Sequence, residues 1–245
     1  MGSGLNETLW LRADCMEWVI FAGSGVSTDG RGDPLGVRAE ASYSHASYRI
    51  EQCAAPYDRS DAILALKRSL RARLEHLDSV LGLATIPTGE GVDPNDWLGK
   101  LEALGIIKKG MLRRLNRLRN AIEHDGAEPP DIDECKDYQE MMWYFLKVTT
   151  PYLRPPMDEE LMPDDSDDPQ NFTCYISYKP FALTVHGTFA EDYLSPAREQ
   201  DWLEIVATSI SAVKKSDSDY LRIIGSVRDP RSRSILLRSL FDKFV

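Results

Sequence analysis

The chain has 245 residues, of which 42% are hydrophobic and 28% charged, and its net charge is −10. This composition is typical of a globular protein, and the excess of acids argues against a general nucleic-acid coat protein. No apolar run approaches the roughly 18–20 residues that cross a bilayer, and the first residues do not resemble a signal peptide, so we expect a cytoplasmic protein without a membrane partner.

The potential metal ligands are dispersed along the chain. The four cysteines form neither a CxxC pair nor a cluster with histidine, which is typical of reduced structural thiols. They are Cys15, Cys53, Cys135 and Cys174. We therefore expect no metal site and no cofactor.

Residues 1–56 form an N-terminal segment that allows two readings. Asn6 is suited to cap a helix that runs to about Ile20, whereas Trp18–Ala22 also fits a short buried strand. A Gly-rich loop follows, and Phe21–Ser27 resembles the phosphate loop of sirtuin-like NAD-binding domains. The helical pattern that starts soon afterwards leaves no room for a Rossmann sheet, so a structural loop is favoured.

Residues 57–157 carry the periodicity of amphipathic helices. Residues 60–82 repeat an apolar side chain every three or four positions, with Ser60 as a candidate cap and Gly82 as the end. Further helices are predicted over 96–104, 107–124 and 132–153, separated by Asp125-Gly126 and closed by Pro155-Pro156.

The acidic residues 158–171 are expected to form a solvated linker, and the pattern then changes. Residues 172–178 and 181–189 alternate with period two, which predicts a hairpin. Residues 202–213 fit a strand or a helix, 220–227 fit a strand, and 232–244 fit a closing helix. The predicted fold class is α+β: an antiparallel helical bundle at 57–157 with a small C-terminal β-rich region and helix at 172–245.

One basic stretch stands out in this acidic chain. No acid interrupts the residues from Ile107 to Arg119. The basic residues there are Lys108, Lys109, Arg113, Arg114, Arg117 and Arg119. A concentrated patch of this kind can bind a polyanion in spite of the net negative charge, which makes RNA the expected partner.

On a helical wheel this stretch divides into two faces, at about 100° per residue. Leu112, Leu115, Leu118 and Ile122 form an apolar stripe. Arg113, Arg117, Asn120 and His124 form a polar stripe on the other side. His124 lies in the last turn, where the helix dipole favours a protonated imidazole suited to acid–base chemistry. The simpler alternative is a solvated basic face that ends in a capping histidine.

Arg119 does not share the face of His124. The two residues are five apart, so on a straight helix they diverge by roughly 140°. They can meet at one phosphate only if the last turn is distorted or if a second copy of the chain completes the site, as in a two-fold homodimer.

The motif Arg119-Asn120-x-x-x-His124 resembles the R-x4–6-H motif of HEPN domains, in which a polar residue usually follows the arginine. The leucine-rich helix at 60–82, the short helix with Trp97 and the basic helix are also similar to the HEPN arrangement. The resemblance covers about residues 57–156.

The resemblance implies a metal-independent endoribonuclease that acts as a homodimer. Arg119 and His124 of two protomers would form a composite site and cleave RNA through attack of the ribose 2′-hydroxyl, with Asn120 as an orienting residue. Lys108, Lys109, Arg113 and Arg117 are the candidate RNA-binding residues. HEPN proteins of this kind act as toxins or antiphage effectors, so an antitoxin or regulatory protein is a further expected partner. The alternative is a non-catalytic HEPN module that dimerises or binds nucleotide or a partner protein.

Overall fold

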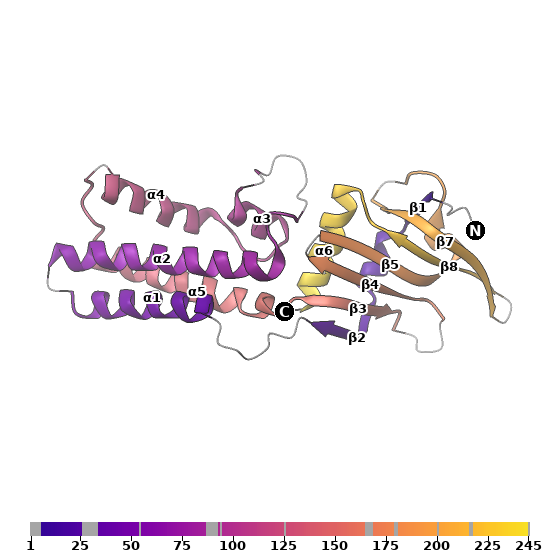
Figure 1. Cartoon of the computed structure of the whole chain (residues 1–245), viewed down its shortest axis with the longest axis horizontal. Helices are drawn as coiled ribbons and strands as arrows, with labels where there is room; N and C mark the ends of the chain where they lie inside the picture. Colours follow the sequence, from indigo (N-terminus) through magenta and orange to yellow (C-terminus); the bar gives the residue numbers. More distant parts are fainter. Residues whose placement is uncertain are drawn as a thin grey trace. The chain divides into compact units, whose positions relative to one another are not determined.

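The computed structural model describes residues 6–25, 34–53, 55–86, 93, 95–124, 126–164, 169–178, 181–199, 201–215 and 218–244 (Figure 1). The chain forms two compact units. The sheet unit comprises residues 1–27, 85–92 and 154–245, and the helical unit comprises 28–84 and 93–153. The chain therefore passes from the sheet unit into the helical unit, returns to the sheet unit at 85–92, enters the helical unit again at 93–153, and ends in the sheet unit.

The sheet unit contains one eight-stranded sheet with the order β2-β3-β4-β5-β8-β7-β1-β6, and its neighbouring strands pair antiparallel. The strands are β1 Glu7–Leu11, β2 Val19–Gly25, β3 Pro156–Met162, β4 Asn171–Tyr178, β5 Phe181–Ala190, β6 Leu194–Ser195, β7 Leu203–Lys215 and β8 Ser218–Ser226. Two short 3-10 turns, η1 (Ala13–Glu17) and η3 (Glu191–Tyr193), link strands.

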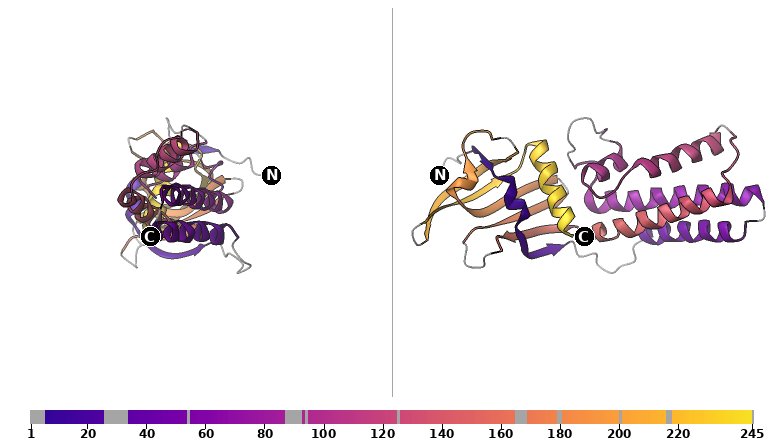
Figure 2. Two further views of the ribbon diagram at one scale, coloured as in Figure 1. Left: turned by 90° about the vertical axis from the view of Figure 1, so that its left-hand side faces the viewer. Right: turned by 180° about the vertical axis from the view of Figure 1, so that it is seen from behind.

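One face of this sheet is covered and the other is open. Helix α6 (Pro230–Phe244) lies across the covered face together with η1, as the right-hand view of Figure 2 shows. In β4 the side chains of Phe172, Cys174 and Ile176 are buried while Tyr175, which points to the other face, is 44% exposed. This alternation is typical of an antiparallel sheet with one solvated face.

The helical unit is built around α2, which packs against α1, α4 and α5. Its helices are α1 Pro34–Glu51, α2 Pro56–Leu81, α3 Trp97–Ala103, α4 Gly110–His124 and α5 Ile132–Thr149, and the 3-10 turn η2 (Pro151–Leu153) follows. Helix α2 begins at Pro56, four residues before the predicted cap, and ends at Gly82, whose φ of 60° suits glycine. In the described part of the chain, no helix combines the length and apolarity needed to span a membrane.

The fold class predicted from the sequence is wrong. The protein is α+β with a large eight-stranded antiparallel sheet, and it is not a helical bundle with a small C-terminal region. The hairpin, the strand at 220–227 and the closing helix are confirmed as β4–β5, β8 and α6, and residues 202–213 lie in β7. The sheet is larger than expected because it also recruits strands from outside 172–245.

Two of those additional strands lie in segments that were expected to have other structures. Of the two readings of the N-terminal segment, the helix from Asn6 to Ile20 is wrong, because β1, η1 and the start of β2 occupy it. The strand reading of Trp18–Ala22 agrees with β2, although most residues of β2 are exposed and not buried. The expected acidic linker contains β3, in which Glu159 is buried and Leu161 is fully buried. Residues 26–33 of the Gly-rich loop and 165–168 of the linker lie outside the described residues.

Candidate functional site

Helix α4 has the two faces that the helical wheel predicts. Leu112 and Leu115 are buried, with exposed fractions of 3% and 0%. The four residues of the polar stripe are exposed: Arg113, Arg117, Asn120 and His124. The apolar stripe packs into the core of the helical unit. The polar stripe, on the opposite side of the helix, therefore faces solvent.

Acids from neighbouring segments neutralise part of the basic stretch. Arg113 pairs with Asp96, the residue that caps α3. The Lys109 ammonium lies 2.9 Å from Glu102, donates to it, and holds the pKa of that carboxyl below its ordinary value. Arg114 pairs with Glu134 of α5 at 2.8 Å. Two of the four candidate RNA-binding residues therefore already have carboxylate partners.

The positive charge that remains is concentrated at Arg117 and Lys108. Both side chains are exposed, and neither forms an ion pair within the described part of the chain. Arg117 lies on the same face as His124, whereas Lys108 precedes α4 and lies beside a groove described below. The exposed polar residues in the second half of α4 that the structure describes are Arg117, Asn120 and His124.

Helix α4 continues without interruption to His124. The side chains of Arg119 and Glu123, and the whole of Asp125, lie outside the described residues. After the helix, Gly126 adopts a φ of 65° and the N–H of Ala127 donates to the carbonyl of Ala121 at 3.1 Å. His124 is exposed at the end of the helix, before this turn.

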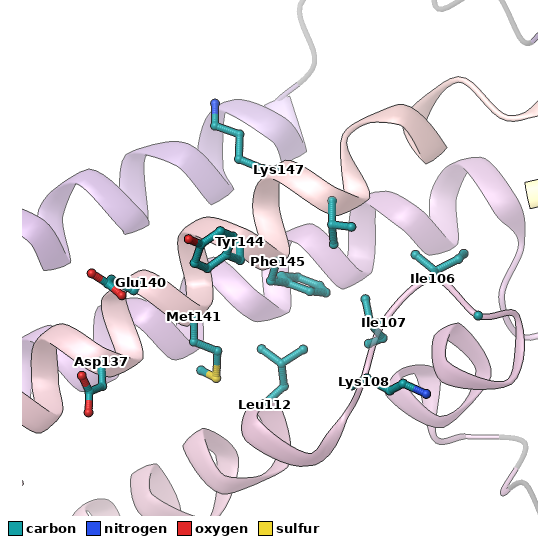
Figure 3. A pocket seen from close by; sticks show the side chains of 12 residues that line it. Ile106, Ile107, Lys108, Leu112, Asp137, Glu140, Met141, Tyr144, Phe145 and Lys147 are labelled. Atoms are coloured by element: carbon teal, nitrogen blue, oxygen red, sulfur yellow. The ribbon is translucent and has the colours of Figure 1, made fainter. Parts of the chain in front are cut away.

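The helical unit has an apolar groove of about 890 Å³ (Figure 3). We call it the α5 groove. Its floor includes Leu112 of α4 and Phe145 of α5, and its rim includes Ile107 from the segment before α4. Charged residues also line the groove. Asp137 and Glu140 lie toward the start of α5, Lys147 lies toward its end, and Lys108 precedes α4.

Large aromatic side chains are exposed beside this groove. Tyr144 is 64% exposed and Trp143 is 43% exposed, and their rings meet edge to face with centroids 5.0 Å apart. Lys147 lies over the Trp143 ring at 5.7 Å. The sequence reasoning missed this surface, although Met141, Tyr144 and Val148 have the spacing of a helix stripe that would have indicated it.

The other notable titratable groups have structural explanations. The buried Lys100 ammonium donates to the carbonyls of Leu83 and Ala84, which follow the end of α2. Glu159 is buried against Gly23, and burial raises the pKa of its carboxyl. All four cysteines are free, and burial raises the pKa of the Cys135 thiol to about 11, which makes it unreactive.

The glycines that resembled a phosphate loop lie in β2, which pairs with β3 at one edge of the sheet. Gly23 there leaves space for the Glu159 side chain. Val26 and Ser27 of that motif lie outside the described residues. Among the described residues there is also no cluster of three or more His, Cys, Asp or Glu side chains arranged to hold a metal ion.

Comparison with known proteins gave no relatives: no protein-family model, no curated protein and no solved structure matches this chain.

Proposed function

We propose that this protein is a metal-independent endoribonuclease of HEPN type, located in the cytoplasm and acting on RNA at the exposed face of α4. The observation that carries the proposal is the exposure of Arg117, Asn120 and His124 on one face at the end of this helix. A guanidinium binds a phosphate, an amide orients it, and an imidazole transfers a proton near neutral pH.

The proposed reaction is an internal transesterification. The ribose 2′-oxygen attacks the adjacent phosphorus and loses its proton, the bond from phosphorus to the 5′-oxygen breaks, and the leaving 5′-oxygen takes up a proton. His124 would carry one of these protons, and Arg119 would stabilise the charge that develops on the phosphorane oxygens. Asn120 would orient the phosphate, while Arg117 and Lys108 would hold the RNA backbone together with Lys109 and Arg113.

A second copy of the chain is part of this proposal. Helix α4 continues to His124, and positions 119 and 124 of a straight helix lie roughly 140° apart around its axis. Two α4 helices related by a two-fold axis would place Arg119 of one copy near His124 of the other. We further propose that the enzyme is a toxin or antiphage effector controlled by an antitoxin or regulatory protein.

A non-catalytic HEPN module is the second candidate function, and one observation favours it. Asp96 and Glu102 neutralise Arg113 and Lys109, which removes about half of the candidate RNA-binding charge. A surface that is only weakly basic suits a protein partner better than a long polyanion.

The decisive experiment is an RNase assay on the full chain with a chelator present. We expect His124→Ala to reduce the cleavage rate at least about 100-fold, which is the usual contribution of an acid–base residue. His186→Ala is the matched control, because this histidine is also exposed but belongs to β5 of the sheet unit. Equal rates for wild type and His124→Ala would refute the catalytic role, and a wild type that neither cleaves nor binds RNA would favour the second candidate.

A further inference from the structure

Helix α5 supplies both part of the lining of the α5 groove and an exposed aromatic side chain, Tyr144, which lines it (Figure 3). The neighbouring Trp143 is also exposed and packs edge to face on Tyr144. Tyrosine and tryptophan are the residues that most often anchor protein interfaces, and here both are exposed beside an apolar hollow. A surface that carries both an anchor and a recess can pair with a copy of itself.

The charges along α5 also suit the pairing of this helix with a second copy of itself. Asp137 and Glu140 lie toward the start of the helix, and Lys147 lies toward its end. Asp137 and Lys147 are equally far from Met142, about 7–8 Å along the axis in each direction. In an antiparallel pair of α5 helices centred there, Asp137 of each copy meets Lys147 of the other. A parallel pair would instead bring like charges together.

We propose that the α5 groove is a self-association surface, in which a second copy of this chain packs its α5 antiparallel across the groove about a two-fold axis. Tyr144 of each copy fills the recess of the other, over the floor formed by Leu112 and Phe145. The two symmetric pairs of Asp137 with Lys147 set the direction of the helices. Apolar contact supplies most of the affinity and the charges select the antiparallel arrangement.

This surface is distinct from the polar face of α4, so the inference goes beyond the proposed function. Leu112 borders the groove near Met141, and Arg114 pairs with Glu134, so α4 runs antiparallel to α5 and carries His124 away from the groove. In the proposed α5 pair the two His124 residues therefore lie at opposite ends. A chain that used the groove alone would form a dimer, and a chain that used both surfaces would form a larger assembly.

The test is the molar mass of the full chain in solution, measured by light scattering at several concentrations against the 27.6 kDa of one chain. We expect wild type to be at least a dimer. Asp137→Lys and Lys147→Glu should each weaken association on the order of tenfold, because two symmetric contacts change from attraction to repulsion, and should halve the mass at intermediate concentration. Asp133→Lys is the matched control, since this α5 acid is 86% exposed and does not line the groove.

Mixing the two variants makes the test specific. In a heterodimer of Asp137→Lys with Lys147→Glu both contacts join opposite charges again, so an equimolar mixture should regain the wild-type mass. This recovery also shows that both variants fold. A monomeric wild type, single variants that keep the wild-type mass, or a mixture that does not recover it would each overturn the proposal. The recovery of mass on mixing the two α5 variants reports on the α5 groove alone, whereas the RNase rate of His124→Ala reports on the proposed function, so the failure of one can be told from the failure of the other.

Discussion

Replacing Lys100 by methionine should substantially destabilise the helical unit. The ammonium is 2% exposed and donates to the carbonyl of Leu83 at 2.6 Å and to that of Ala84 at 3.2 Å. These carbonyls belong to the segment that follows α2, so the lysine of α3 links its own helix to the C-terminal end of α2. Methionine has a similar length but cannot donate a hydrogen bond, and it leaves the buried Leu83 carbonyl without this donor.

The expected magnitude follows from these two contacts. Hydrogen bonds from a charged donor contribute about 1.5–3 kcal/mol each, and the cost of burying the ammonium offsets part of that sum. We therefore expect the free energy of unfolding to fall by about 2–4 kcal/mol, with the Leu83 contact dominant because the Ala84 carbonyl is only partly buried. Urea denaturation followed by the helical circular dichroism signal measures this change. Lys136→Met is the matched control, since that side chain is 57% exposed on α5.

The pH dependence provides a second readout. Burial lowers the pKa of Lys100 below its ordinary value of 10.5. Between the folded pKa and 10.5 the unfolded chain binds more protons, so the stability of wild type relative to Lys100→Met should rise as the pH increases through this interval. A loss of stability below about 0.5 kcal/mol at neutral pH, or a relative stability that falls with pH in that interval, would refute this account of Lys100.

Three further changes test other parts of the structure. Gly187→Ala should lower the free energy of unfolding by several kcal/mol, measured by thermal or urea unfolding, because the new Cβ would overlap the Cβ of Phe172 and lie 2.6 Å from the carbonyl oxygen of Asn171. Gly110→Ala is the control, since a Cβ there meets open space and should be neutral or stabilise the protein by up to about 1 kcal/mol. Equal effects of the two substitutions would contradict the close packing at Gly187. Glu159→Gln should stabilise the sheet unit at neutral pH, because burial raises the pKa of the Glu159 carboxyl and the wild type loses stability as the pH rises from 4.5 through that folded pKa. A stabilisation by Glu159→Gln that increases toward acid pH would contradict this account. Gly126→Ala should cost about 1 kcal/mol through its φ of 65°, and no cost would show that the turn after His124 is not held in that conformation.

Elements with strong local signals were predictable from the sequence. The repeating leucines of α2 and the two-faced pattern of α4 reflect burial on one side of a helix, and a helix closes its hydrogen bonds within its own segment. The β4–β5 hairpin was predictable for the same reason, because its partners are adjacent in the chain. Helix α1 was missed because its residues form no clear apolar stripe; its buried positions are mostly small, such as Gly36, Ala39 and Ala46.

The misassigned strands depend on distant partners. Val19 of β2 pairs with Met162 of β3, and Glu7 of β1 pairs with Ala207 of β7. No window along the sequence contains both members of these pairs. Residues 158–160 are all acidic, which is typical of a solvated segment, yet Glu159 is buried because Gly23 on the neighbouring strand leaves it space.

The same division applies to the candidate site. By itself, the sequence determined that Arg117, Asn120 and His124 share one exposed helix face, because a helical repeat and an apolar stripe decide that orientation locally. Only the tertiary structure decided how much charge that face retains, since Asp96 and Glu102 reach it from another segment. It alone also revealed the α5 groove, because a hollow exists only where side chains from separate helices meet and leave space between them.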